Sequence, residues 1–205
     1  MATTKKTKAK RTAERKAARS QKSQADRASG EAMTALELLE QDHREVEDYF
    51  DAYETLDDDE EKGELATKIC LALTVHTQLE EEIFYPAARK ATKDDDLLDE
   101  AAVEHAGAKE LVSQIESMEP GDDLYDAKIK VLGEQIKHHV KEEEEELFPE
   151  IEKAKADVEA LGKKLAARKS ELISKLEGGS AAGRSKMGVD RAAAGDKPSK
   201  PRDRK

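Results

Sequence analysis

Two short stretches of the sequence pair a histidine with a glutamate four residues later and end at a proline. Residues 76–86 read HTQLEEEIFYP and residues 139–149 read HVKEEEEELFP, so the distance from His to Pro along the chain is the same in both. A spacing of four places the His and the Glu on one helix face, one turn apart. Imidazole and carboxylate together suit iron, manganese or zinc. The candidate ligand pairs are His76 with Glu80 and His139 with Glu143.

Two more histidines, His43 and His105, lie on the apolar stripes of two other predicted helices. Apolar residues recur at alternating steps of three and four in each helix, which is the pattern of a helix that buries one face. Each helix has one histidine on its stripe, and the fifth histidine, His138, lies off the stripe, about 100° round the helix from its neighbour. The predicted helices span residues 32–55, 59–90, 95–118 and 122–154.

The links between these helices are short and acidic: LDDDEEKG, KDDD and EPGDD. Short links make consecutive helices antiparallel neighbours, so the sequence predicts an all-α protein, an up-down-up-down antiparallel four-helix bundle. A further amphipathic stretch from Val158 to Leu176 predicts a short fifth helix that packs across one end of the bundle.

The four helices read as two copies of one helical hairpin. An acidic residue precedes His43 and also His105, and the distances from His43 to His76 and from His105 to His139 differ by one residue. A pseudo-two-fold axis would bring four histidines and two glutamates together in the bundle. Burying carboxylates without partners costs several kcal/mol each, and a pair of metal ions bridged by the two glutamates removes that cost.

Charge divides the chain into three parts. The chain has 205 residues, of which 40% are charged, and a net charge of −11. Residues 1–30 hold ten Lys/Arg against two Asp/Glu, a net of +8, and residues 178–205 hold eight against three, a net of +5, which leaves −24 for residues 31–177. We expect a folded bundle over 31–177 between two disordered basic tails, because residues 1–30 have no Leu, Ile, Val or Phe.

The sequence also excludes several classes of protein. A single cysteine, Cys70, excludes an intramolecular disulfide and a zinc site built on cysteines. No run of about 18 apolar residues could span a membrane, and the N-terminus has no apolar segment of a secretory signal. We therefore predict a cytoplasmic protein without a membrane partner.

The histidine pattern resembles the hemerythrin-like family, also called the HHE cation-binding family. The motifs that carry the resemblance are DH at 42–43, HTQLEEEIFYP at 76–86, EH at 104–105 and HHVKEEEEELFP at 138–149. The resemblance covers about residues 34–176. It implies a non-haem centre of two iron ions, with Mn or Zn as alternatives. The ligands it implies are His43, His76, Glu80, His105, His139 and Glu143.

The chain departs from the family's oxygen carriers on the third helix. Those relatives have a further histidine one turn from the first, and this chain has Lys109 four residues after His105 and Ala101 four residues before it. Fewer protein ligands leave more positions for an external ligand. The resemblance therefore implies binding, sensing or reaction with O2, NO or peroxide in a stress response. The alternatives are an iron-sensing or iron-binding module and a DNA-associated protein with a structural metal.

The sequence also suggests roles for residues outside the six candidate ligands. The basic tails could bind nucleic acid without sequence preference through its phosphates. Asp42 and Glu104 could orient imidazoles of neighbouring helices or face solvent. Glu81 and most other members of the glutamate runs are expected on the solvated side. The tyrosines and Cys70 are expected to be packing residues.

Overall fold

The computed structural model describes residues 32–92 and 95–187, and these residues form helices and their links without a strand. The predicted all-α class is confirmed. Residues 1–31 and 188–205 lie outside the described residues. They include all of the predicted N-terminal tail and most of the predicted C-terminal tail. The α-helices and the two π-helical turns, η1 and η2, are α2 (Ala35–Tyr53), α3 (Asp59–Leu79), η1 (Glu80–Phe84), α4 (Tyr85–Thr92), α5 (Asp96–Glu116), α6 (Tyr125–Glu142), η2 (Glu143–Leu147), α7 (Phe148–Ala154) and α8 (Val158–Met187).

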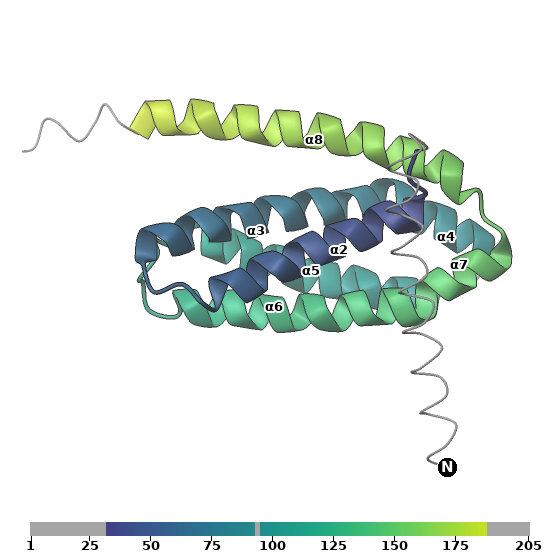
Figure 1. Cartoon of the computed structure of the whole chain (residues 1–205), viewed down its shortest axis with the longest axis horizontal. Helices are drawn as coiled ribbons and strands as arrows, with labels where there is room; N and C mark the ends of the chain where they lie inside the picture. Colours follow the sequence, from purple (N-terminus) through teal and green to yellow (C-terminus); the bar gives the residue numbers. More distant parts are fainter. Residues whose placement is uncertain (1–31, 93–94, 188–205) are drawn as a thin grey trace, which may run out of the picture.

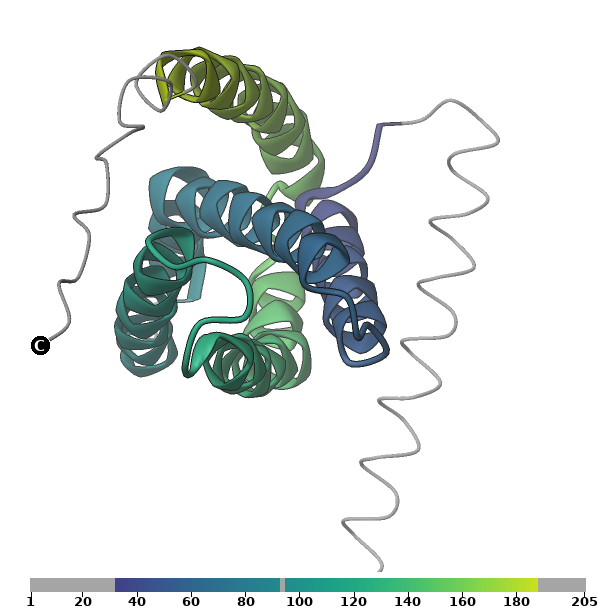
Figure 2. The ribbon, with the colours of Figure 1, turned by 90° about the vertical axis from the view of Figure 1, so that its left-hand side faces the viewer.

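Four long helices, α2, α3, α5 and α6, lie side by side around a common core (Figures 1 and 2). Consecutive helices run in opposite directions (Figure 1), and α2 packs on α3 and α6 while α5 packs on α3 and α6. Every helix therefore has a neighbour on each side, and the four inward faces enclose one interior.

Local sequence explains where two of these helices begin. Thr34 accepts a hydrogen bond from the Glu37 N–H while the Glu37 side chain accepts one from the Thr34 N–H, which is a capping box. Asp58, in the acidic link, accepts hydrogen bonds from the N–H groups of Glu60 and Glu61. These side chains satisfy amide groups that the first turn leaves without helical partners.

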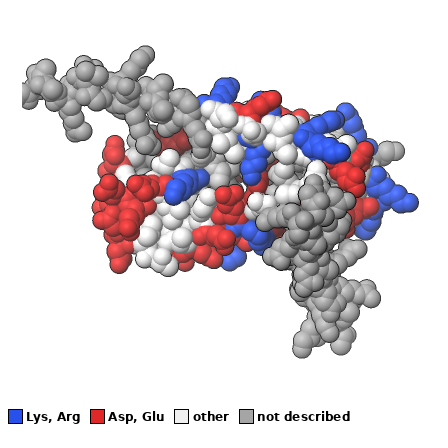
Figure 3. Space-filling model, turned by 45° about the horizontal axis from the view of Figure 1, so that its top comes forward, with Lys and Arg blue, Asp and Glu red and all other residues white. Residues whose placement is uncertain are grey.

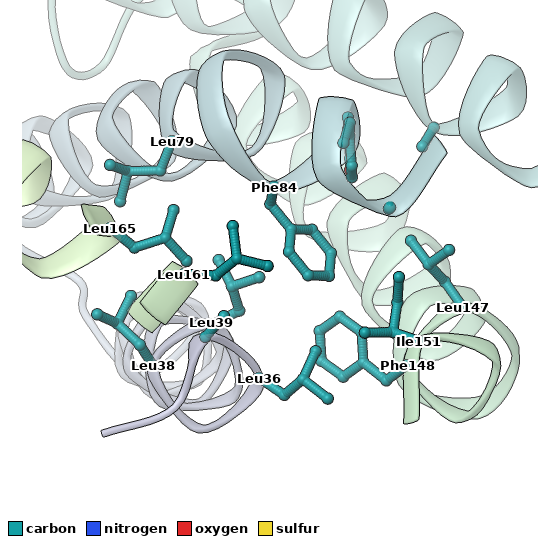
Figure 4. Packing of buried hydrophobic residues seen from close by; sticks show 14 of the residues in the cluster. Leu36, Leu38, Leu39, Leu79, Phe84, Leu147, Phe148, Ile151, Leu161 and Leu165 are labelled. Carbon is teal, nitrogen blue, oxygen red and sulfur yellow. The ribbon is translucent and has the colours of Figure 1, made fainter. Parts of the chain in front are cut away.

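The apolar core consists of two clusters along the bundle, with polar residues between them. One includes Ile69 and Leu73 of α3 and surrounds the end with the α2–α3 link. The other, at the opposite end, includes Phe84 and Phe148, whose rings meet edge to face with centroids 5.7 Å apart (Figure 4). On α3, His76 lies between these two regions, so the histidine layer is enclosed by apolar side chains on both sides.

The last helix, α8, differs from the predicted short fifth helix. It has 30 residues and lies along α2 and α3 (Figure 1), where it also contacts η1, so both the predicted length and the predicted position across one end are wrong. Its buried residues Leu161, Leu165 and Leu172 pack against apolar side chains of α2 and α3. The helix continues to Met187, past the predicted boundary at 177.

The surface is strongly acidic at one end of the bundle. Figure 3 shows Asp and Glu covering the end that carries the α2–α3 link, where residues 57–61 are exposed. In the ranges that the structure describes, no helix is long and apolar enough to cross a membrane.

Candidate metal centre

The six residues predicted as ligands come together in the middle of the bundle. The histidines come one each from α2, α3, α5 and α6, and the two glutamates open the π-helical turns η1 and η2. All six side chains are buried. They are His43, His76, Glu80, His105, His139 and Glu143.

The histidines form two facing pairs. The Nε2 atoms of His43 and His76 lie 3.1 Å apart, and those of His105 and His139 lie 3.2 Å apart. Each pair unites the two helices of one hairpin, as the sequence repeat indicates. Two nitrogen donors bound to one ion have a similar separation, because metal–nitrogen bonds of 2.0–2.1 Å at tetrahedral angles place them about 3.3–3.4 Å apart.

The two carboxylates link one pair to the other. Glu80 Oε2 lies 3.2 Å from His76 Nε2 and 3.3 Å from His105 Nε2. Glu143 Oε2 lies 3.4 Å from His43 Nε2 and 3.8 Å from His139 Nε2. Each glutamate therefore reaches an imidazole of both hairpins, and this arrangement suits a carboxylate shared by two ions.

The buried oxygens lack enough donors. Glu80 Oε1 and Glu143 Oε2 have no hydrogen-bond partner among the described residues, although both side chains are buried. A buried acceptor without a donor is costly, and a buried carboxylate more so. Metal coordination satisfies such oxygens directly, so the donor set fits two ions of the iron, manganese or zinc type.

The pKa values of the buried groups also indicate that the two carboxylates need positive charge beside them. Burial and the nearby Glu143 raise the pKa of Glu80 to about 8. Burial acts the same way on Glu143, but the neighbouring charges of His139 and His43 outweigh it and hold its pKa below the usual range. Burial opposes a charge on His43, yet Glu143 and Glu144 raise the pKa of His43 to about 10. Without metal, protons on the imidazoles have to balance the carboxylates; bound metal would displace them.

The π-helical turns position the glutamates. The Tyr85 N–H bonds the carbonyl of Glu80 and the Phe148 N–H bonds that of Glu143, five residues back in both cases. Pro86 and Pro149 come one residue later, where a proline cannot donate the next helical hydrogen bond. The helices continue beyond these prolines to Thr92 and Ala154, since the wider turn precedes each proline.

Four further carboxylates face the imidazoles from outside, three of them within hydrogen-bond distance. Asp42 Oδ2 lies 3.7 Å from His76 Nδ1, and Glu104 Oε2 lies 2.8 Å from His139 Nδ1. Both acidic residues serve the neighbouring helix, the first of the two roles considered for them. Such partners set the tautomer and orientation of a metal-binding imidazole.

The other two outer carboxylates come from the opposite hairpin. Glu144 Oε1 lies 3.1 Å from His43 Nδ1, and Glu81 Oε1 lies 3.2 Å from His105 Nδ1. Arg44 pairs with Glu144, and Lys109 pairs with Glu81. Glu81 is exposed, as expected, and its carboxylate also reaches His105 and Lys109 of the next helix. Lys109, at the position of the missing histidine, lies outside the cluster.

One tyrosine also points into the centre. The buried Tyr85 hydroxyl donates to Glu143 Oε1 at 2.9 Å and lies 3.2 Å from His105 Nε2. Burial, followed by the charges of Glu143 and Glu80, raises its pKa well above the usual value. Tyr85 is buried in the apolar cluster, as expected of a packing residue, and its hydroxyl also reaches the metal centre. The position of Tyr85 directly before the motif's proline is the signal that could have identified it.

A cleft of about 290 Å³ reaches this centre from the α2–α3–α8 side. His76 and Asp42 lie on its wall, and Lys169 of α8 bonds Asp42 Oδ1 there. The side chain of His76 is 9% exposed, and His76 is the one candidate ligand that lines this cleft.

The fold and this cluster define a helical metal-binding protein. The chain belongs to the hemerythrin family: residues 34–151 match the family model described as the hemerythrin HHE cation binding domain. The resemblance indicated by the sequence motifs is thus confirmed.

Two relatives illustrate the range of similar proteins. A solved structure, the hemerythrin HHE cation binding domain-containing protein of Mycobacterium kansasii described as an Rv2633c homolog, is 24% identical with a TM-score of 0.61, and the match covers 78% of this chain and 96% of that one. It supports the fold alone. A protein named DNA nickase from Nostoc sp. (strain PCC 7120 / SAG 25.82 / UTEX 2576) is 28% identical over 153 residues, 74% of this chain and 43% of that protein. The chain therefore spans less than half the length of this relative.

Proposed function

We propose that this protein is a non-haem di-iron protein that binds, senses or reacts with O2, NO or peroxide in a stress response. The observation that carries the proposal is the convergence of four imidazoles on two buried carboxylates, each of which leaves one oxygen without a hydrogen-bond donor. Oxygen and nitrogen donors without a thiolate suit iron, and bridging carboxylates in a helical bundle are typical of dinuclear iron or manganese sites.

Each hairpin would hold one ion. His43 and His76 would bind the first and His105 and His139 the second, and each glutamate would bridge the two. The ions would supply Lewis acidity and redox chemistry toward a small ligand. The outer carboxylates orient the imidazoles, and the Tyr85 hydroxyl, whose oxygen lies 2.9 Å from Glu143 Oε1, donates its proton in a hydrogen bond to that carboxylate.

The protein residues leave room for a small ligand. Six side chains supply fewer donors than two six-coordinate ions accept. Lys109, where oxygen carriers of the family have a further histidine, pairs with Glu81 and adds no donor. The cleft beside His76 gives a small molecule a way in. These features favour binding of or reaction with the ligand over reversible oxygen carriage.

Metal content with the visible spectrum tests the proposal. Protein from iron-supplemented cells should contain two irons per chain, with absorption that changes on reduction and on exposure to O2, NO or peroxide. The variant Glu143→Gln should lose metal, while Glu145→Gln, an exposed member of the same run, should keep it. Two zincs without a ligand-dependent spectrum would favour a structural metal, and no metal after iron-replete expression would refute the proposal.

A second candidate function, association with DNA, has one specific observation behind it. The Nostoc relative is named a DNA nickase, and the segment 1–30 carries a net charge of +8. Basic segments bind DNA through phosphates, with affinity that falls as salt rises. Binding to mixed-sequence DNA at low and moderate salt, with and without residues 1–30, tests this candidate. Equal affinity of the full-length and the shortened protein would refute the role of the tail.

A further inference from the structure

A second His-x-x-x-Glu pair lies one residue before the inner pair of α6. His138 Nε2 lies 3.3 Å from Glu142 Oε1 and 3.6 Å from Glu104 Oε1 of α5. The side chains of His138, Glu142 and Glu104 are 60%, 31% and 22% exposed. The overlap of two such pairs in HHVKEE thus creates one cluster inside the bundle and another on its surface.

The geometry of the surface cluster suits one cation. Donors bound at 2.0–2.1 Å to a tetrahedral ion lie about 3.3–3.4 Å apart, close to both distances from the imidazole nitrogen. All three donor atoms lie within 4.8 Å of one another. Among the described residues, no lysine or arginine forms an ion pair with Glu104 or Glu142. The two carboxylates face only the imidazoles of His138 and His139.

The opposite hairpin shows a cation at the matching position. Asp42 corresponds to Glu104, since both precede a histidine of the inner cluster and both face the histidine of the next helix. One oxygen of Asp42 faces His76, and the other accepts a hydrogen bond from the Lys169 ammonium group of α8. The carboxylate at this place in the fold therefore uses its outer oxygen to bind a positive charge.

The same comparison shows why the two hairpins differ. Val75 and Leu79 stand where the second hairpin has His138 and Glu142, and they are buried in the apolar cluster that includes the leucines of α8. No α8 equivalent packs on the α5–α6 side (Figure 2) among the described residues. The first hairpin thus has buried apolar residues under α8, and the second has a partly exposed histidine and carboxylate at the same positions.

We propose that Glu104, His138 and Glu142 form a third, surface site for a divalent cation such as Zn²⁺. The ion takes the position that the Lys169 ammonium group occupies on the other hairpin. Imidazole with two carboxylates is a donor set for zinc, manganese or ferrous iron, and solvent completes the coordination.

The surface ion shares Glu104 with the inner cluster, because the second oxygen of that carboxylate holds His139 Nδ1. An ion at the surface thus lies one side chain away from an inner ligand. The site is placed to receive ions on their way to the inner cluster, and this use rests on the proposed function.

Calorimetric titration with Zn²⁺ tests the surface site. The full-length protein with its bound metals is first passed over a chelating resin, which removes weakly held ions. The wild type should bind one more Zn²⁺ per chain than His138→Ala, and Glu142→Gln should weaken this binding by at least about tenfold, a change that even an outer partner of a metal ligand can cause. The matched control is Glu134→Gln, which removes the same charge one turn before His138 and should bind like the wild type.

Equal binding by the wild type, His138→Ala and Glu142→Gln, or no additional ion in the wild type, would overturn the surface site. Because the readout is a difference between variants, it holds whether or not the inner cluster contains iron. A second measurement addresses the loading role: chelator-treated His138→Ala should take up Fe²⁺ more slowly than the wild type and reach the same final content. Equal rates would overturn the loading role, and no inner iron in either protein would overturn the proposed function alone.

Discussion

At the scale of single residues, the two hairpins also differ at the position nine residues after the inner histidine. The first has Tyr85 there and the second has Phe148, and both rings lie beside a histidine of the cluster. Only the tyrosine brings a hydroxyl to the glutamates. The polar groups around the two histidine pairs are therefore unequal, and an external ligand would meet a proton donor on one side only.

Replacing Tyr85 by Phe should leave the fold intact and weaken metal binding. The change keeps the buried ring but removes a donor to Glu143, and loss of such an outer partner costs about 10–100-fold in metal affinity. Competition with a chelator measures the affinity. The control is Tyr49→Phe, which removes a hydroxyl bonded to Glu45 on the surface and should have no effect. Equal losses in both variants would contradict the role of Tyr85.

Cys70 should be almost unreactive in the native protein. Burial raises the pKa of its thiol from the ordinary 9.0 to about 12. The thiolate is the reactive form, so its population near pH 8 is lower by roughly a thousandfold than for an exposed cysteine, and reactivity grows only as pH rises toward 12. Iodoacetamide labelling followed by mass spectrometry measures the rate, with guanidinium-unfolded protein as the control. Rapid labelling of the folded protein at pH 8 would contradict this prediction.

The sequence was sufficient to predict that the six inner residues converge, because apolar steps of three and four identify the residues on one helix face. Glu80 and Glu143 are the first residues of the π-helical turns, so their spacing from His76 and His139 still obeys α-helical geometry. Residues later in the turns and after them do not. The sequence did not predict the contact of Glu81 with His105 or that of the Tyr85 hydroxyl with Glu143, because side chains within and after a π-helical turn no longer follow the α-helical period.

At the scale of elements, α8 was the least predictable helix. Its apolar residues indicate a buried face but not the partner that covers it, and that partner is α2 with α3. Gly162 explains how closely the helices approach: a Cβ atom there would lie 2.2 Å from the carbonyl oxygen of Met33 and 2.7 Å from the carbonyl carbon of Thr34. Glycine allows the backbone of α8 to lie against the start of α2.

Gly162→Ala should therefore destabilise the protein. Alanine is favoured over glycine inside a helix by about 1 kcal/mol, but the clash with backbone atoms should reverse the sign, at a cost of about 1–3 kcal/mol. The matched control is Gly107→Ala in α5, where the nearest atom to the new Cβ would be Gln135 Oε1 at 3.7 Å and the propensity gain should remain. Urea unfolding gives both changes, and stabilisation by Gly162→Ala would contradict the close packing of α8.

At the scale of the whole molecule, two apolar clusters and the polar centre between them depend on each other. The end with the α2–α3 link is acidic (Figure 3), and like charges gathered there repel one another. The interior adds two buried carboxylates. With metal bound, the centre joins four helices; without it, protons are the cations that can balance the glutamates. Metal should thus link both halves of the bundle into one cooperative unit.

Removing the metal should consequently lower the stability of the whole chain. A ligand that binds only the folded state stabilises it by about 4 kcal/mol at a thousand times its dissociation constant. Binding also requires deprotonated ligands, so the difference between metal-bound and metal-free protein should widen as pH rises from acidic to neutral. Thermal unfolding with and without a strong chelator measures it. Glu143→Gln, which lacks one bridging carboxylate, should respond little to the chelator. If the chelator left the unfolding temperature of the wild type unchanged at neutral pH, the prediction would be contradicted. The apolar clusters would then suffice to hold four imidazoles and two carboxylates together without metal.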